Sequence, residues 1–201
     1  MAEAFLTVAG RGRATFEDRG SEFIGQVTPV ASIDEAEAFI DSVRETYDDA
    51  THNVPAYRVR EDGFLREYAT DDGEPSGSAG DPIATVLAGQ ELENVVAVVT
   101  RYYGGTNLGI GGLVEAYSTV TAAAIEDAGT ETRRPRDRVL LETDYADSGT
   151  VRGILEGAEL TFEADYDETV RFRVAIPSAD RETLLDELRS ATSDRIDIED
   201  I

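Results

Sequence analysis

A continuous run of five apolar residues, Val95–Val99, restricts the possible folds of this chain more than any other segment. A short run this rich in valine is typical of a β-strand whose two faces are both covered. The fold must therefore place a packed layer on each side of this strand. The chain has 201 residues and 41% hydrophobic content, which is enough for one large domain or two small ones.

Two helices are predicted from capping residues and apolar spacing. Ser32 and Glu35 have the spacing of a capping box, and apolar residues follow at helical intervals over residues 33–48. A longer helix, rich in alanine, is expected from about Gly112 to Ala128, with Gly129 as its C-cap.

The rest of the first half reads as short strands and one further helix. Its expected elements are one or two strands within residues 14–27, a hairpin of Ala56–Arg60 and Phe64–Tyr68, and a helix with Asp81 as N-cap and Pro82 in its first position. The polar segment 70–82 contains Gly and Pro at several positions and is predicted to be a rigid loop.

A second domain is predicted after the polar segment Thr130–Arg136, which contains Pro135 and is interpreted as a linker. The elements expected beyond it are strand 138–145, helix 147–157, strands 159–166 and 168–176, helix 178–190 and strand 195–199. The order βαββαβ is that of a ferredoxin-like domain. The predicted fold class is therefore α+β, with domains at residues 1–130 and 137–201.

The chain is strongly acidic, with a formal net charge of −24 from 42 acidic and 18 basic residues, and every basic residue is arginine. Repulsion of this size loosens a compact fold unless salt screens it. We interpret the composition as an adaptation to a salt-rich cytosol; the alternative is an ordinary acidic protein from a GC-rich genome. Because a generic phosphate-binding surface is net basic, nucleic-acid binding would require a local arginine cluster.

Several classes of site and location are disfavoured by what the sequence lacks. The absence of cysteine excludes disulfides, thiolate zinc sites and cysteine nucleophiles. No stretch approaches the roughly 18 apolar residues that cross a bilayer, and residues 1–10 lack the pattern of a secretory signal. We therefore expect a cytoplasmic protein with no membrane partner, no cofactor and no metal.

The segment Arg101–Gly112 joins the apolar run to the alanine-rich helix and is a candidate anion site. Its glycines are Gly104, Gly105, Gly109, Gly111 and Gly112. Glycine lets the backbone approach a ligand, and a helix N-terminus favours an anion such as phosphate. Arg101 would be the anion contact, and Tyr102 or Tyr103 would stack on bases. The alternative is that the glycines only permit tight packing and that Arg101 pairs with a nearby acid.

Catalytic candidates lie in and near segment 70–82. His52 is the only histidine and could act as a general base. Ser76 or Ser78 could be a nucleophile, with His52 as its base and Asp72 orienting the ring. Neither serine lies in a Gly-x-Ser-x-Gly turn, and a single histidine is more often structural.

The acids of the same segment, Asp71, Asp72 and Glu74, offer oxygen ligands for a divalent cation. Their spacing is not that of an EF-hand loop. Acids in loops are usually solvated, so no metal site is predicted from them.

These two segments together resemble the signatures of the IMPACT/YigZ family. Residues 71–82 read Asp-Asp-Gly-Glu-Pro-Ser-Gly-Ser-Ala-Gly-Asp-Pro, in which Ser78 replaces the usual Thr. Residues 100–117 resemble the second signature, with Tyr103 in place of Phe. His52 followed by Ala-Tyr four residues later also matches, whereas a Lys common near the start of the family pattern and a Cys common after the histidine are absent.

The resemblance implies a ribosomal protein S5 domain 2-like N-terminal domain and a ferredoxin-like C-terminal domain. The same pair resembles domains IV and V of elongation factor G, which suggests contact with RNA or the ribosome. The eukaryotic relative regulates translation initiation by competing for an activator of a translation-control kinase, using an additional domain. For the short members, the resemblance supplies no established reaction.

The leading hypothesis is a non-enzymatic regulatory protein, linked to translation or stress response, that binds RNA, the ribosome or a translation-related protein through Asp71–Gly80 and Arg101–Gly112. One alternative is a hydrolase, a peptidase or phosphoesterase, that uses His52 with Asp72 and Ser76. Another is a sensor of a nucleotide or phosphate. Convergence of the three catalytic candidates within hydrogen-bond reach would favour the enzyme, and their separation would favour binding.

Overall fold

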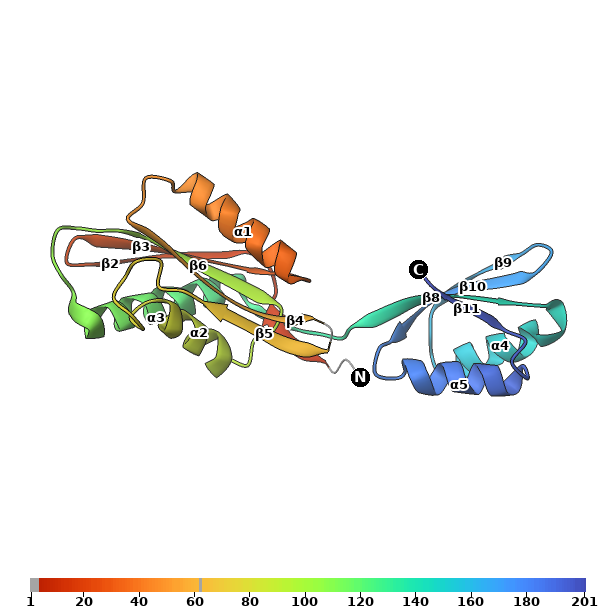
Figure 1. Cartoon of the computed structure of the whole chain (residues 1–201). Helices are drawn as coiled ribbons and strands as arrows, with labels where there is room; N and C mark the ends of the chain where they lie inside the picture. The colour runs from red at the N-terminus through yellow and green to blue at the C-terminus, as the bar shows by residue number, and fades with distance from the viewer. Residues whose placement is uncertain (1–3, 62) are drawn as a thin grey trace. The chain divides into compact units, whose positions relative to one another are not determined.

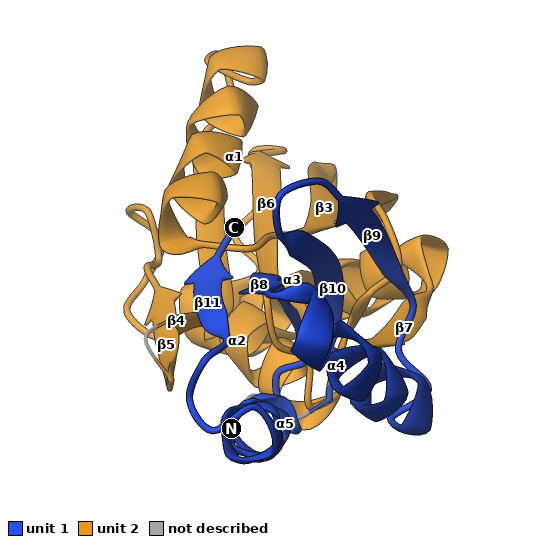
Figure 2. Cartoon of the chain, turned by 90° about the vertical axis from the view of Figure 1, so that its right-hand side faces the viewer, with its two compact units in different colours: residues 1–4, 134–201 blue, residues 5–133 orange. Residues whose placement is uncertain are grey.

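The computed structural model describes residues 4–61 and 63–201, which form two compact units, one of Phe5–Arg133 and one built from Arg134–Ile201 (Figure 2). Each unit has a hydrophobic core of its own. The predicted fold class, α+β with an S5 domain 2-like unit followed by a ferredoxin-like unit, is confirmed.

The first unit is built on a five-stranded antiparallel sheet with strand order β2-β3-β6-β4-β5. Its strands are β2 Gly12–Asp18, β3 Ser21–Pro29, β4 His52–Glu61, β5 Phe64–Ala69 and β6 Val95–Tyr102. Three helices cover it: α1 Ile33–Thr46 lies on one face, and α2 Gly80–Gly89 and α3 Gly109–Ala128 lie on the other (Figure 1).

Both faces of the central strand β6 are buried, as the apolar run predicts. Val95, Ala97 and Val99 pack in the core under α2 and α3. Val96 and Val98 pack against α1 on the opposite face. Because side chains alternate along a strand, Arg101 continues the row that faces α2 and α3.

The helix boundaries show which capping predictions are confirmed. Ser32 is the N-cap of α1, and its Oγ accepts the N–H of Glu35. The return bond differs from a capping box, because the Glu35 carboxylate accepts the N–H of Ala31. Helix α3 begins three residues before the predicted Gly112, and Gly129 ends it with a φ of 66°.

The predicted linker Thr130–Arg136 is mostly strand. Residues 130–133 form β7, which pairs antiparallel with β1, Phe5–Val8. Only Arg134 and Pro135 separate β7 from the next strand. All four residues of β7 are exposed, so no apolar alternation marks the strand in the sequence.

The second unit has the predicted order βαββαβ. Its elements are β8 Arg136–Thr143, α4 Tyr145–Gly157, β9 Phe162–Tyr166, β10 Val170–Pro177, α5 Arg181–Ala191 and β11 Asp197–Asp200. The strands form one antiparallel sheet in the order β11-β8-β10-β9. Both helices cover the same face of this sheet (Figure 1), so its other face, called the open face below, carries no helix of this unit.

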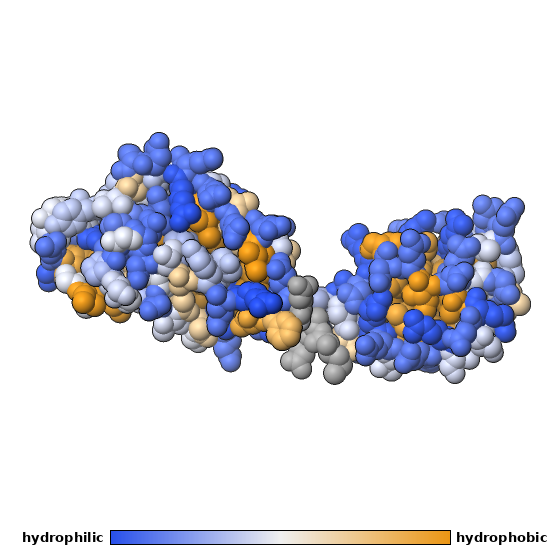
Figure 3. Space-filling view, viewed as in Figure 1, coloured by the Kyte–Doolittle hydropathy of each residue, from blue (hydrophilic) through white to orange (hydrophobic). Residues whose placement is uncertain are grey.

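The surface seen in Figure 3 is mainly hydrophilic, and the hydrophobic residues on it form small patches. This agrees with a chain in which 30% of the residues are charged. Across residues 4–61 and 63–201, no helix combines the length and the hydropathy needed to cross a membrane.

Candidate functional site

Two loops of the first unit carry both signatures. The acidic loop, residues 70–79, joins β5 to α2, and the glycine loop, residues 103–108, joins β6 to α3. Arg101 lies in register between Phe23 of β3 and His52 of β4. Residues paired across antiparallel strands share one face of the sheet, so these three side chains lie together at the base of the loops.

Glu74 of the acidic loop reaches into this base. Its Oε1 lies 2.5 Å from Arg101 Nη1 and accepts a 2.8 Å hydrogen bond from Tyr117 Oη of α3. Glu74 is only 8% exposed and Arg101 only 5%. Burial, together with the neighbouring Glu74 carboxylate, raises the pKa of Tyr117 far above its ordinary value. Tyr117 therefore stays protonated and remains a donor to Glu74.

Arg101 was expected to contact an anion directly, but its side chain is buried beneath the two loops. Its guanidinium is neutralised by Glu74 and lies over the rings of Phe23 and Tyr103, with centroids at 5.3 and 5.4 Å. The burial of β6 explains the difference, because position 101 faces the core. Arg101 supports the two loops from below, as in the alternative reading of the sequence.

Ser21, at the start of β3, fixes the beginning of the glycine loop. Its Oγ accepts the N–H of Gly104 at 3.1 Å and a hydrogen bond from Arg101 Nη2 at 3.3 Å. A Cβ at position 104 would lie 1.9 Å from the carbonyl carbon of Gly20. Gly104 is therefore required by the close approach of two backbones.

Asp71 organises the acidic loop. Its Oδ2 accepts the N–H of Gly77 at 2.8 Å, and its Oδ1 accepts those of Ala79 and Gly80 at 3.0 and 2.9 Å. Burial alone would raise the pKa of Asp71, but these three N–H groups outweigh burial and lower it. Asp71 thus satisfies the start of α2 in place of the predicted N-cap, Asp81, because the helix begins at Gly80.

The side chain of His52 contacts the backbone of the acidic loop. Its Nδ1 lies 2.6 Å from the carbonyl oxygen of Asp72, which can only accept, so Nδ1 carries the proton. His52 Nε2 lies 3.9 Å from Glu74 Oε2. The carboxylate of Asp72 points elsewhere, accepting the N–H of Asn53 at 2.8 Å and lying 3.8 Å from Arg44.

The three catalytic candidates do not converge. Within the described residues, Ser76 is exposed and no hydrogen bond joins its side chain to His52 or Asp72. Ser78 is buried and donates to the carbonyl of Pro75. The nucleophile–base contact that a hydrolase needs is therefore not formed. In the same described ranges, no three His, Asp or Glu side chains gather as a metal site would require.

The exposed part of the site is the glycine loop and the first turn of α3. Tyr103 is 45% exposed and Ile110 is 62% exposed. No side chain caps α3, and its first turn holds no acidic residue. Tyr102 is less available than predicted, because its Oη donates a 2.6 Å hydrogen bond to Asp49, which raises the pKa of Tyr102 to about 12.

Three residues of the site were missed by the sequence reasoning, namely Ser21, Tyr117 and Ile110. The first two act through long-range contacts with Arg101, Gly104 and Glu74. Tyr117 lies four residues after the buried Leu113 on α3, and this helical spacing is the signal that it faces the loops.

Comparison with known proteins agrees with this architecture. The chain matches the model of the Impact N-terminal domain over residues 19–125 and that of a domain of unknown function (DUF1949) over residues 141–195. It is 31% identical to the IMPACT family member YvyE of Bacillus subtilis over 201 residues, which cover 100% of this chain and 92% of the relative. It is 32% identical to YigZ of Escherichia coli over 179 residues, 88% of each chain.

A solved structure supports the same relationship over the full length. A crystal structure described as that of a hypothetical protein matches with a TM-score of 0.69 and 30% identity, covering 100% of this chain and 98% of the other. The two domain models match in the same order as the two structural units. The chain therefore belongs to the IMPACT family, as a two-domain member of the YigZ type.

Proposed function

We propose that this chain is a non-enzymatic regulatory protein of the cytoplasm, linked to translation or stress response, that binds a partner through the acidic loop and the glycine loop. The candidate partners are RNA, the ribosome and a translation-related protein. The translation link is supported by membership of the IMPACT family. Binding is favoured over hydrolysis because His52, Asp72 and Ser76 do not form a catalytic arrangement.

The observation that supports this proposal most is that the carboxylates of Asp71 and Glu74 point into the fold. In the acidic loop, Asp71 accepts backbone N–H groups and Glu74 pairs with buried partners, so both negative charges are compensated inside the fold. No acidic residue occurs between Glu93 and Glu115, a stretch that includes the whole glycine loop. In a chain of net charge −24, an acid-free stretch of this length repels an anionic partner less than acid-rich parts of the surface do.

RNA, free or within the ribosome, fits this surface best among the three partners. The uncapped first turn of α3 offers backbone N–H groups to a phosphate oxygen. The exposed ring of Tyr103 rests on the Arg101 guanidinium and leaves an aromatic face for a base. These contacts need no basic patch, which the chain lacks here.

A charge placed in the glycine loop tests the proposal. Thr106 is exposed and makes no hydrogen bond with a described residue, so Thr106→Glu adds one negative charge without removing a contact. Ala38→Glu, on exposed α1 across the sheet, is the matched control with the same net charge. At equal salt, we expect Thr106→Glu to weaken association with RNA or ribosomes about tenfold, and Ala38→Glu to leave it unchanged.

Association is measured by fluorescence anisotropy with single-stranded RNA and by co-sedimentation with ribosomes. The proposal fails if the wild-type chain associates with neither at any salt concentration. It also fails if the two variants weaken association equally, since only total charge would then matter. Pull-down from native high-salt lysate with both variants shows whether a protein partner depends on the same loop.

A further inference from the structure

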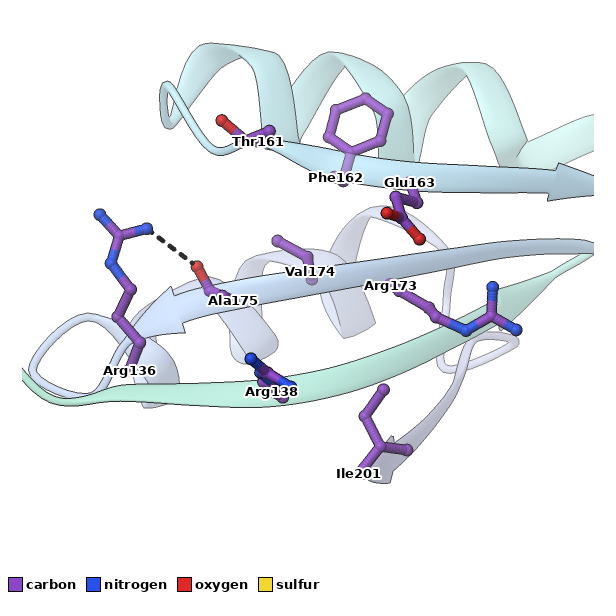
Figure 4. Close-up of a pocket in the computed structure, with 9 residues that line it drawn as sticks. All are labelled: Arg136, Arg138, Thr161, Phe162, Glu163, Arg173, Val174, Ala175 and Ile201. Carbon is purple, nitrogen blue, oxygen red and sulfur yellow. Dashed lines mark hydrogen bonds between the residues drawn. The ribbon is translucent and has the colours of Figure 1, made fainter. Parts of the chain in front are cut away.

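A second feature belongs to the other unit and lies on the open face of the ferredoxin-like sheet. A groove of about 450 Å³ runs over β8, the start of β9 and the end of β10, with Ile201 at its border (Figure 4). Arg136, Arg138, Glu163 and Ala175 line it.

The strand register shows which charged residues of this open face lie opposite one another. Arg171 lies opposite Glu142 of β8 and Asp165 of β9, and Arg173 lies opposite Glu163. Both arginines are neutralised, Arg171 by Glu142 at 2.8 Å and Arg173 by Asp165 at 2.5 Å. In this half of the face, each arginine charge is therefore neutralised by a carboxylate.

Arg136 and Arg138 form the other half. They are two residues apart on β8, so their side chains share one face, and their partners on β10 are the uncharged Pro177 and Ala175. Neither arginine forms a salt bridge with any residue that the structure describes. Arg136 donates only a weak 3.5 Å hydrogen bond to the carbonyl oxygen of Ala175.

Uncompensated arginines are the minority in this chain. Twelve of the 18 arginines form a salt bridge among residues 4–61 and 63–201. With 42 acids available, two adjacent guanidiniums on one strand face without an acidic partner mark a place suited to an external anion.

We propose that this groove binds a small organic phosphate, the phosphate monoester of a hydroxylated, sugar-like body. A phosphate monoester carries close to two negative charges and three acceptor oxygens, which two neighbouring guanidiniums match. Glu163 forms no salt bridge with a described residue and lines the groove, so its carboxylate accepts hydroxyl groups of the body. Ala175 and Ile201, the latter 57% exposed, supply apolar surface beneath it.

The dimensions of the groove agree with a ligand of this class. Small-molecule sites have volumes of about 300–1,000 Å³, which includes the observed value. Phe162 is among the residues that line the groove, but its ring lies on the core side of β9, where it packs against Phe172 (Figure 4). A sugar-like body therefore fits better than a body that must stack.

The test is a titration of the full ¹⁵N-labelled chain with glucose 6-phosphate at fixed salt, followed by amide NMR. We expect saturable shifts at Arg138, Ala175 and Ile201. Arg138→Glu should weaken the affinity at least about tenfold, because a charge-assisted hydrogen bond is lost. Arg66→Glu, an exposed position on β5 of the first unit, is the control with the same charge change and should keep wild-type affinity.

Two kinds of result would contradict the proposal in whole or in part, and one would require a second variant. Absence of saturable shifts up to about 10 mM, or equal affinity of the Arg138→Glu and Arg66→Glu variants, overturns the proposal. Inorganic phosphate that binds as tightly as glucose 6-phosphate overturns the role of the sugar-like body. If the melting temperature shows that Arg138→Glu does not fold, the neutral Arg138→Gln replaces it, with the same loss of affinity expected.

Discussion

Arg101 and Glu74 form a buried ion pair across 27 residues of sequence, with 2.5 Å between Nη1 and Oε1. Arg101 is the last but one residue of the central strand β6, and Glu74 belongs to the acidic loop. The pair therefore joins the two signature segments of the family through their charged side chains. Its burial makes it structurally sensitive, since either charge alone would be left uncompensated in the core.

Glu74→Gln tests this dependence. The variant leaves the Arg101 guanidinium buried without its counter-ion, so we expect a loss of about 3–5 kcal/mol in the free energy of unfolding. Denaturant unfolding at fixed salt measures it. Glu131→Gln is the control, since Glu131 pairs with Arg133 at 2.8 Å with both side chains over 40% exposed. That variant should lose less than about 1 kcal/mol. Equal losses would contradict a structural role for the buried pair.

Gly104→Ala and Gly111→Ala separate a required glycine from a replaceable one. A Cβ at 104 would lie 1.9 Å from Gly20 and 2.4 Å from the nitrogen of Ser21, so the turn between β2 and β3 must move. We expect a destabilisation of about 1–3 kcal/mol. Gly111 lies in α3 with no heavy atom within 4 Å of an added Cβ, so alanine should stabilise by up to about 1 kcal/mol. Unfolding curves of both variants check the opposite signs.

Tyr102 should ionise later than an ordinary tyrosine. The hydrogen bond that its neutral hydroxyl donates to Asp49 raises its pKa to about 12, and burial adds to this. A raised pKa means that the contribution of this bond to stability is complete below the ordinary tyrosine pKa and is lost as pH rises through about 12. NMR titration of the tyrosine ring carbons measures it, and Asp49→Asn should return the pKa toward 10. An unchanged pKa in that variant would exclude Asp49 as the cause.

The salt-rich cytosol suggested by the composition predicts a salt-dependent fold. With a net charge of −24, screening should raise the melting temperature between about 0.1 and 3 M KCl. Sucrose at matched osmolality is the control, since it stabilises by exclusion without screening charge. A melting temperature that does not change with KCl would contradict the adaptation.

Much of the fold could be predicted because its apolar residues repeat with the period of each element. In β10, Val170, Phe172 and Val174 are buried and alternate with the exposed Arg171 and Arg173. This alternation is typical of a β-strand with one buried face. The start of α3 was harder to predict from the sequence. Its first residues are glycine-rich and poor helix formers, and packing of the helix further along stabilises it.

The site was harder to predict than the fold. A loop acid such as Glu74 is ordinarily solvated, and nothing local shows that it reaches the core. Arg101 could have been assigned to the core face from its even spacing from Val95 and Val99. Its partner, Glu74, depends on the pairing of β4 with β5, which places the acidic loop, and on Tyr117 of α3. Long-range contacts of this kind are absent from any single segment of sequence.

The pairing of β1 with β7 has a consequence for biosynthesis. Phe5–Val8 leaves the ribosome early, whereas its partner Thr130–Arg133 is the last strand of the first unit to be made. Until then β1 has only the single bridge between Leu6 and Leu92, so most of its edge is exposed to pairing with other chains. The first unit closes only when its final strand emerges, while the strands that follow pair solely with one another and can assemble as a separate step.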